Sequence, residues 1–211
     1  CVYMQNSGLG NAINPLVSLA SKEVYSIPML LLIGWRGELL NDDQQIKDEP
    51  QHSHQGKITL NQLEILNIPY IILSKESSEW KNKVLWIINE AKEKSIPVSI
   101  VFRKNAFEEK DKDHNIEEAK SFPLTREEII EIIGSTAPKS IPIFSTTGMA
   151  SRELYEFRKN QISATSDFLT VGGMGCASSI SLGFLRASKR KKAICIDGDG
   201  SFLMHLGAIK T

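Results

Sequence analysis

Residues 197–201 read Asp-Gly-Asp-Gly-Ser, and their types point more directly to chemistry than any other stretch of the chain. They follow an apolar run at 193–196, which predicts a buried strand, and precede residues 202–209, which predict a helix. Glycines let a phosphate approach the backbone, and a helix N-terminus offers N–H groups to it. Because a carboxylate alone repels phosphate, the pattern indicates a Mg²⁺ ion between Asp199 and a diphosphate. The alternative is a tight turn of any Rossmann-like domain, where such strand–turn–helix junctions are common.

The elements that must position these residues alternate between strands and helices. Strands are expected at 2–5, 28–34, 70–73, 97–103, 141–145, 168–171 and 193–197. Helices are expected at 11–22 (with Pro15 in the first turn), 59–67, 78–94, 126–134, 150–158 and 176–187. Thr59/Gln62 and Thr125/Glu128 form candidate capping boxes, and the polar stretch 37–56 is expected to be a long exposed loop. This alternation predicts the α/β class, with a doubly wound parallel sheet formed twice.

The composition excludes several classes of partner. The 211 residues carry 25 basic and 25 acidic side chains, and a net charge of zero argues against nucleic acid or an acidic membrane surface. The longest apolar stretch, 27–35, is too short to span a bilayer. Cys1, Cys176 and Cys195 show no metal-ligand spacing and fit a reducing cytoplasm better than a disulfide framework.

Both ends of the sequence fall inside expected secondary structure, so we expect the chain to be a piece of a longer protein.

Four segments carry the functional signal in a fixed order. They are QNSGLGN at 5–11, GWRGE at 34–38 with DEPQH at 48–52, STTGM at 145–149, and VGGMG at 171–175 with GDGS at 198–201. Together they resemble the thiamine-diphosphate-dependent 2-oxoacid decarboxylases over essentially the whole chain. In that family a pyrimidine-binding domain precedes a diphosphate-binding domain. The resemblance therefore implies the end of the first domain at 1–107, a linker at 108–123 and the front of the second at 124–211, with both sheets incomplete.

The resemblance also implies where the cofactors bind. It assigns Mg²⁺ to Asp199, whereas Asp197 is expected to be structural. It assigns thiamine diphosphate to residues that follow the strands of the second domain: Thr146, Thr147, Gly148, Gly172, Gly173, Met174, Gly175, Gly198, Gly200 and Ser201. The family's catalytic glutamate would lie before Cys1 and its second Mg²⁺ ligand, an asparagine, after Thr211, so no catalytic residue is assigned within the chain. The family binds one cofactor across a subunit interface, so a homodimer or larger homo-oligomer is expected.

The substrate expected from the resemblance is a small 2-oxoacid, with 3-phosphonopyruvate of phosphonate biosynthesis first and sulfopyruvate second. A phosphonate dianion needs cations nearby, and Arg36, His52 and Arg103 are the candidates. Alternatively, Arg36 caps strand carbonyls or pairs with Glu38, and His52 is an exposed loop residue. The competing class of protein is a non-catalytic diphosphate-binding α/β module. It is weakened because the chain has neither a Walker A pattern nor a GxGxxG fingerprint.

Overall fold

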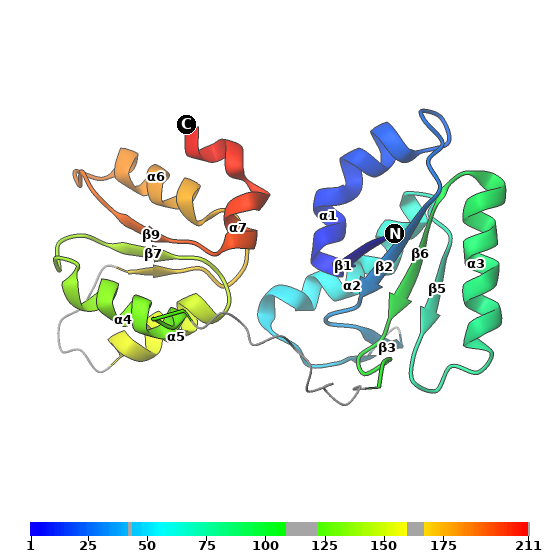
Figure 1. The fold of residues 1–211 in the computed structure, drawn as a ribbon, viewed down its shortest axis with the longest axis horizontal. Coiled ribbons are helices and arrows are strands. Elements are labelled where there is room, and N and C mark those ends of the chain that lie inside the picture. The colour runs from blue at the N-terminus through cyan, green and yellow to red at the C-terminus, as the bar shows by residue number, and fades with distance from the viewer. Residues whose placement is uncertain (42–43, 109–121, 160–166, 211) are drawn as a thin grey trace. The chain divides into compact units, whose positions relative to one another are not determined.

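The computed structural model describes residues 1–41, 44–108, 122–159 and 167–210. The chain divides into two compact units, Cys1–Asp113 and His114–Thr211. Most of the linker expected at 108–123 lies outside the described residues. Each unit is an α/β layer structure with a parallel sheet, which confirms the predicted fold class (Figure 1).

The first unit is built on four parallel strands in the order β1–β2–β6–β5. Their bounds are β1 Val2–Gln5, β2 Met29–Gly34, β5 Tyr70–Leu73 and β6 Pro97–Phe102, and a short antiparallel pair, β3 Leu39–Asn41 and β4 Gln44–Gln45, follows β2. The central strand β6 is buried over its first five residues, because helices cover both faces of the sheet. An apolar run with no alternation, as in residues 97–102, is what such a position requires.

Helices pack on opposite faces of this sheet and form two separate apolar cores. On one face lie α1 Asn6–Pro15, its π-helical continuation Leu16–Ala20, and α2 Pro50–Ile65, while α3 Trp80–Lys94 covers the other face (Figure 1). Leu31 and Ile33 of β2 pack toward Leu9 and Leu63 on the first face. The odd-numbered and even-numbered side chains of β2 thus serve different cores, as the period of two in a strand dictates.

The second unit has three parallel strands in the order β8–β7–β9. The strands are β7 Ile143–Ser145, β8 Phe168–Leu169 and β9 Ile194–Ile196, and the helices are α4 Arg126–Thr136, α5 Met149–Arg158, α6 Ala177–Ala187 and α7 Asp199–Met204, followed by a 3₁₀ turn at Leu206–Lys210. Within this unit α6 lies on one face of the sheet, and α4 and α5 lie on the other (Figure 1). The predicted capping box at the start of α4 is confirmed, since Thr125 and Glu128 bond each other's backbone N–H groups.

Three helix boundaries differ from the sequence-based expectation. The helix expected at 11–22 begins five residues earlier, at Asn6. Pro15 therefore lies at the last position of α1 and not in its first turn, and a wider π-helical turn follows it. The helix α2 begins at Pro50, nine residues before the helix expected at 59–67. The end of the stretch 37–56, which was expected to be an exposed loop, is therefore helical. Thr59 therefore caps nothing: its hydroxyl donates to the Gln55 carbonyl one turn earlier, at 2.7 Å. The helix expected at 202–209 begins at Asp199 and gives way to a 3₁₀ turn after Met204.

Candidate functional site

The carboxyl ends of the three parallel strands in the second unit carry the loops where the cofactor residues are expected. Thr146, Thr147 and Gly148 follow β7, residues 172–175 follow β8, and residues 198–201 follow β9. Strands that run parallel bring these three loops to one edge of the sheet. The backbone N–H of Thr146 bonds the Ile196 carbonyl at 2.8 Å, so pairing between β7 and β9 continues to the edge itself.

The side chain of Ser201 links all three loops. Its hydroxyl lies 2.8 Å from the Thr146 hydroxyl and accepts a hydrogen bond from the Gly175 N–H at 2.9 Å. Thr147 adds a second link, since its hydroxyl donates to the Val171 carbonyl at 2.5 Å. Ser201 is buried in the first turn of α7, so this bonding fixes the start of the helix against the loops after β7 and β8. The structure thus brings the expected residues of the three loops together.

Two aspartates flank the turn before α7 and differ in exposure. Asp199 is exposed at the first position of α7, and its Oδ1 accepts a hydrogen bond from the Gly200 N–H at 2.7 Å. Asp197 is half-buried, and its Oδ1 accepts from the Gly198 N–H at 3.1 Å. The exposed carboxylate is thus the one of the two that solvent or a ligand reaches more freely.

The donor set of this edge fits a Mg²⁺–diphosphate group. Carboxylate and hydroxyl oxygens are the ligands that Mg²⁺ accepts, and it takes only one or two from protein when phosphates supply others. Among the described residues no group of three or more His, Cys, Asp or Glu side chains could hold a metal, so Asp199 would bind as a single carboxylate. A Cβ placed on Gly198 would meet no atom within 4 Å, so open space lies in front of that backbone.

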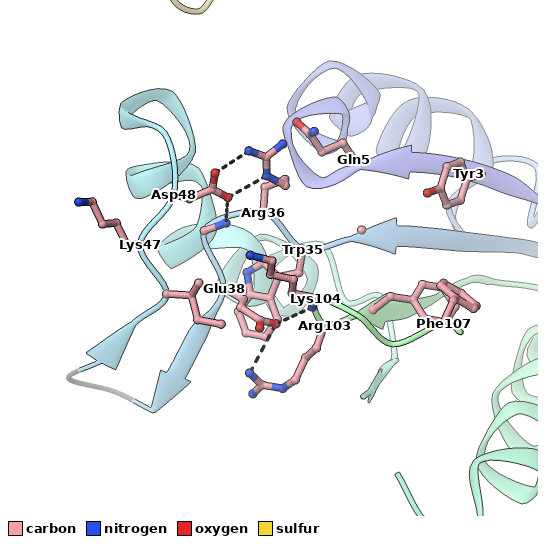
Figure 2. A pocket seen from close by; sticks show the side chains of 14 residues that line it. Tyr3, Gln5, Trp35, Arg36, Glu38, Lys47, Asp48, Arg103, Lys104 and Phe107 are labelled. Atoms are coloured by element: carbon pink, nitrogen blue, oxygen red, sulfur yellow. Dashed lines mark hydrogen bonds and ion pairs between the residues drawn. The ribbon is translucent and has the colours of Figure 1, made fainter. Parts of the chain in front are cut away.

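A cavity of about 560 Å³ opens in the first unit, at the carboxyl ends of β1, β2 and β6 (Figure 2). Its wall includes the aromatic side chains of Trp35, Phe102 and Phe107. Two of the expected substrate residues, Arg36 and Arg103, line it. The third, His52, is not among the lining residues.

Arg36 is bound by Asp48 rather than Glu38. Its Nε and Nη2 donate to the two carboxylate oxygens of Asp48 at 2.8 and 2.5 Å, and the Gly37 N–H adds a third bond to this carboxylate. These bonds, the one from Arg36 first, hold the pKa of Asp48 well below its usual range. Pairing with Glu38, one of the alternatives considered for Arg36, is therefore wrong.

Asn6 and two glycines hold the Arg36 backbone in place. The buried Asn6 amide donates to the Arg36 carbonyl at 3.0 Å and to the Thr59 hydroxyl at 2.8 Å, and its oxygen accepts from the Arg36 N–H at 3.2 Å. A Cβ on Gly56 would overlap the Gly37 carbonyl, so α2 approaches the loop after β2 at backbone contact. Sequence reasoning missed this role of Asn6, although the QNSGLGN segment contains it.

Arg103 belongs to a second ion pair on the same cavity wall. Its Nη1 donates to the Leu39 carbonyl at 2.8 Å and lies 3.6 Å from a Glu38 carboxylate oxygen, and its guanidinium lies 5.2 Å from the centre of the Trp35 ring. Glu38 is only 4% exposed and also accepts from the Lys104 backbone N–H at 3.3 Å. Burial raises the pKa of Glu38, and the Arg103 charge opposes that rise.

His52 is buried on α2 instead of exposed in a loop, which overturns the alternative considered for it. It is only 9% exposed, and its Nδ1 has no hydrogen-bond partner within the described ranges. Burial, followed by the nearby Arg36 charge, lowers the pKa of His52. The neutral imidazole is therefore the form favoured at neutral pH.

A parallel α/β unit with glycines, hydroxyls and an aspartate at its strand ends has the features of a phosphate-binding α/β protein. Residues 145–211 match the family model described as "Thiamine pyrophosphate enzyme, C-terminal TPP binding domain". This match spans the region from the end of β7 through α7 and includes every residue expected to contact the cofactor.

Within the described ranges no helix is both long and apolar enough to cross a membrane.

The chain is also similar to several curated proteins, and those described here are decarboxylases or subunits of decarboxylases. Phosphonopyruvate decarboxylase of Streptomyces viridochromogenes is 28% identical over 224 residues, which cover 100% of this chain and 53% of that protein. Sulfopyruvate decarboxylase subunit beta of Methanocaldococcus jannaschii is 40% identical over 90 residues, 43% of this chain and 45% of that subunit. Sulfopyruvate decarboxylase subunit alpha of Methanococcus maripaludis is 37% identical over 104 residues, 47% of this chain and 54% of that subunit.

The chain spans about half the length of the curated relatives it matches. The resemblance inferred from the motifs is confirmed, and the chain is a homologue of the thiamine-pyrophosphate-dependent decarboxylases.

Proposed function

We propose that the protein containing this chain decarboxylates 3-phosphonopyruvate to phosphonoacetaldehyde and CO₂, with thiamine diphosphate and Mg²⁺ as cofactors. The observation that carries the proposal is the Ser201 hydroxyl, which bonds Thr146 and Gly175 next to the exposed Asp199 carboxylate. Alignment of the whole chain with phosphonopyruvate decarboxylases supports the choice of reaction. The reaction would belong to phosphonate biosynthesis, such as that of 2-aminoethylphosphonate, in the cytoplasm.

When bound, thiamine diphosphate supplies an electron sink for the carbanion that loss of CO₂ produces. The residues of this chain would bind and orient it: Asp199 would hold the metal, and the backbone N–H groups at 172–175 and 198–201 would bind the diphosphate. Thr146 and Thr147 fix the loop after β7 through the bonds to Ser201 and the Val171 carbonyl. We assign no proton transfer to a residue of this chain.

In the first unit Arg36, Arg103 and His52 are proposed to serve the substrate. Arg36 and Arg103 line the cavity and each keeps guanidinium N–H groups beyond those that bond Asp48 or the Leu39 carbonyl. His52 does not line the cavity, but its backbone carbonyl on α2 lies against Gly37, next to Arg36. A homo-oligomer of at least two copies forms the working enzyme.

Sulfopyruvate is the second candidate substrate, favoured by the 40% identity to a sulfopyruvate decarboxylase subunit. Release of CO₂ by the full-length protein, with both cofactors, on 3-phosphonopyruvate, sulfopyruvate and pyruvate tests the proposal. We expect the highest kcat/KM on 3-phosphonopyruvate. A higher value on sulfopyruvate would reverse the assignment of substrate, and no turnover of any 2-oxoacid would favour a diphosphate-binding module without chemistry.

A further inference from the structure

The charges around the cavity of the first unit do not cancel. Four cationic side chains, those of Arg36, Lys47, Arg103 and Lys104, line it together with two carboxylates, Glu38 and Asp48. Each carboxylate is engaged by an arginine: Asp48 by Arg36 at 2.5 Å and Glu38 by Arg103 at 3.6 Å. The two lysines remain, and neither lies within ion-pair distance of a carboxylate in the described part of the chain, although the Lys104 charge, after that of Arg103, also helps to lower the pKa of Glu38. The cavity therefore carries a surplus of positive charge.

The two lysines differ in position. Lys47 extends away from the other labelled side chains, whereas Lys104, two residues after the end of β6, lies beside Trp35 and Glu38 (Figure 2). The backbone of Lys104 is tied to this wall, because its N–H donates to the buried Glu38 carboxylate at 3.3 Å. Lys104 is thus the cation whose backbone is fixed at the cavity while Glu38, the carboxylate next to it, already pairs with Arg103.

The rest of the wall suits the carbon part of a small ligand. Trp35 is 5% exposed, and its ring is fixed by the indole N–H, which donates to the Gly56 carbonyl at 2.9 Å. Arg103 covers one face of this ring. A tetrahedral anion near Lys104 would place a short carbon chain against Trp35 and Phe102, which combines one charged contact with apolar surface.

We infer that this cavity binds the phosphonate or sulfonate group of a small organic acid, with Lys104 as the residue that provides the net charge. The inference rests on the proposed function, because it names the residue of the first unit that recognises the anionic end of the substrate. Arg36 and Arg103 then act as N–H donors whose charge is already balanced by Asp48 and Glu38. Sequence reasoning had named the two arginines and not Lys104.

The test uses probes that cannot be decarboxylated by the proposed reaction, so it is independent of turnover. Binding of phosphonoacetate and of sulfoacetate to the full-length protein is measured by titration calorimetry at low ionic strength. Lys104→Gln is expected to weaken binding of the preferred probe by about 10- to 100-fold, the usual effect of losing a charge-assisted contact. Lys104→Arg should keep most of the affinity. Lys92→Gln, on the exposed side of α3, is the matched control and should bind like the wild type.

The outcomes separate this inference from the proposed function. Equal affinities of the wild type and Lys104→Gln, or no binding of either probe to the wild type, would overturn the inference even if the protein releases CO₂ from 3-phosphonopyruvate. Binding that depends on Lys104 in a protein without decarboxylase activity would support the inference and remove the proposed reaction. The stronger of the two probes distinguishes a phosphonate from a sulfonate site.

Discussion

The guanidinium of Arg36 and the carboxylate of Asp48 form a two-point ion pair that closes the loop between β2 and α2. Asp48 is also bonded by the N–H groups of Gly37 and Glu49, so one carboxylate joins three points of the loop. The side chain of Asp48 is 15% exposed and that of Arg36 is 43% exposed. The pair therefore contributes through geometry more than through Coulomb energy, which water weakens at the exposed end.

Asp48→Asn should remove part of the acid sensitivity of the fold. The folded-state pKa of Asp48 lies below its unfolded value of about 3.9, so the unfolded chain takes up the proton first. The stability that this group provides is complete above about pH 5 and is lost as the pH falls through about 4 toward the lowered pKa. We expect the free energy of unfolding to drop by about 1 kcal/mol more in the wild type than in Asp48→Asn between about pH 5 and 3. Urea unfolding across this range measures it, and parallel slopes for the two proteins would contradict it.

Arg36→Ala should lower kcat/KM on 3-phosphonopyruvate by about 10- to 100-fold while leaving pyruvate, which lacks the phosphonate, little affected. The structure supplies a control that the sequence could not, because Arg36→Ala also leaves the Asp48 carboxylate uncompensated. In the double variant Arg36→Ala/Asp48→Asn that carboxylate is gone. If the double variant recovers wild-type kcat/KM, the loss came from Asp48 repelling the substrate. A loss shared equally by both substrates would assign Arg36 to the loop or to the cofactor.

Sequence patterns predicted the parallel strands of both units, because each is a short apolar run. The antiparallel pair β3 and β4 was missed, because it lies in the polar stretch 37–56 that was expected to be an exposed loop. The early start of α2 was missed because its buried face consists of His52, Gly56, Thr59 and Leu63. These residues have helical spacing, but only the last one is a large apolar side chain. The start of α7 was missed for a similar reason, since Gly198 and Gly200 around Asp199 read as a turn.

The contacts within the first-unit cavity could not be predicted from the sequence. Several acidic residues lie near Arg36 in the chain, and only the folded loop selects Asp48 over Glu38. Lys104 follows the apolar run of β6 and carries no motif of its own. Its significance emerges only when Glu38 and Asp48 are seen to be occupied by arginines.

Asp199→Asn and Asp197→Ala should separate metal binding from folding. Asp199 is exposed at the start of α7, so its loss should weaken Mg²⁺-dependent binding of thiamine diphosphate by at least about tenfold with little change in thermal stability. Asp197 is half-buried and its Oδ1 accepts from the Gly198 N–H, so Asp197→Ala, which removes this acceptor, should chiefly lower stability, by about 1 kcal/mol. Titration calorimetry with thiamine diphosphate, with and without Mg²⁺, and thermal unfolding test the pair in the full-length protein. Normal cofactor affinity in Asp199→Asn would remove this residue from the metal site.

Gly175→Ala should disrupt the junction of the three loops in the second unit, whereas Gly183→Ala should not. Gly175 has a φ of +89°, and a Cβ there would overlap the His205 ring and crowd Met204 at 3.2 Å. We expect a loss of about 3 kcal/mol from strain and overlap together, and weaker binding of thiamine diphosphate, because the Gly175 N–H would move away from Ser201. Gly183 lies inside α6, where an added methyl group would meet no atom within 4 Å, so its replacement should gain about 0.5–1 kcal/mol of helix stability. Urea unfolding of the two variants decides the matter: equal stabilities would mean that the loop after β8 tolerates a side chain and does not fix the start of α7.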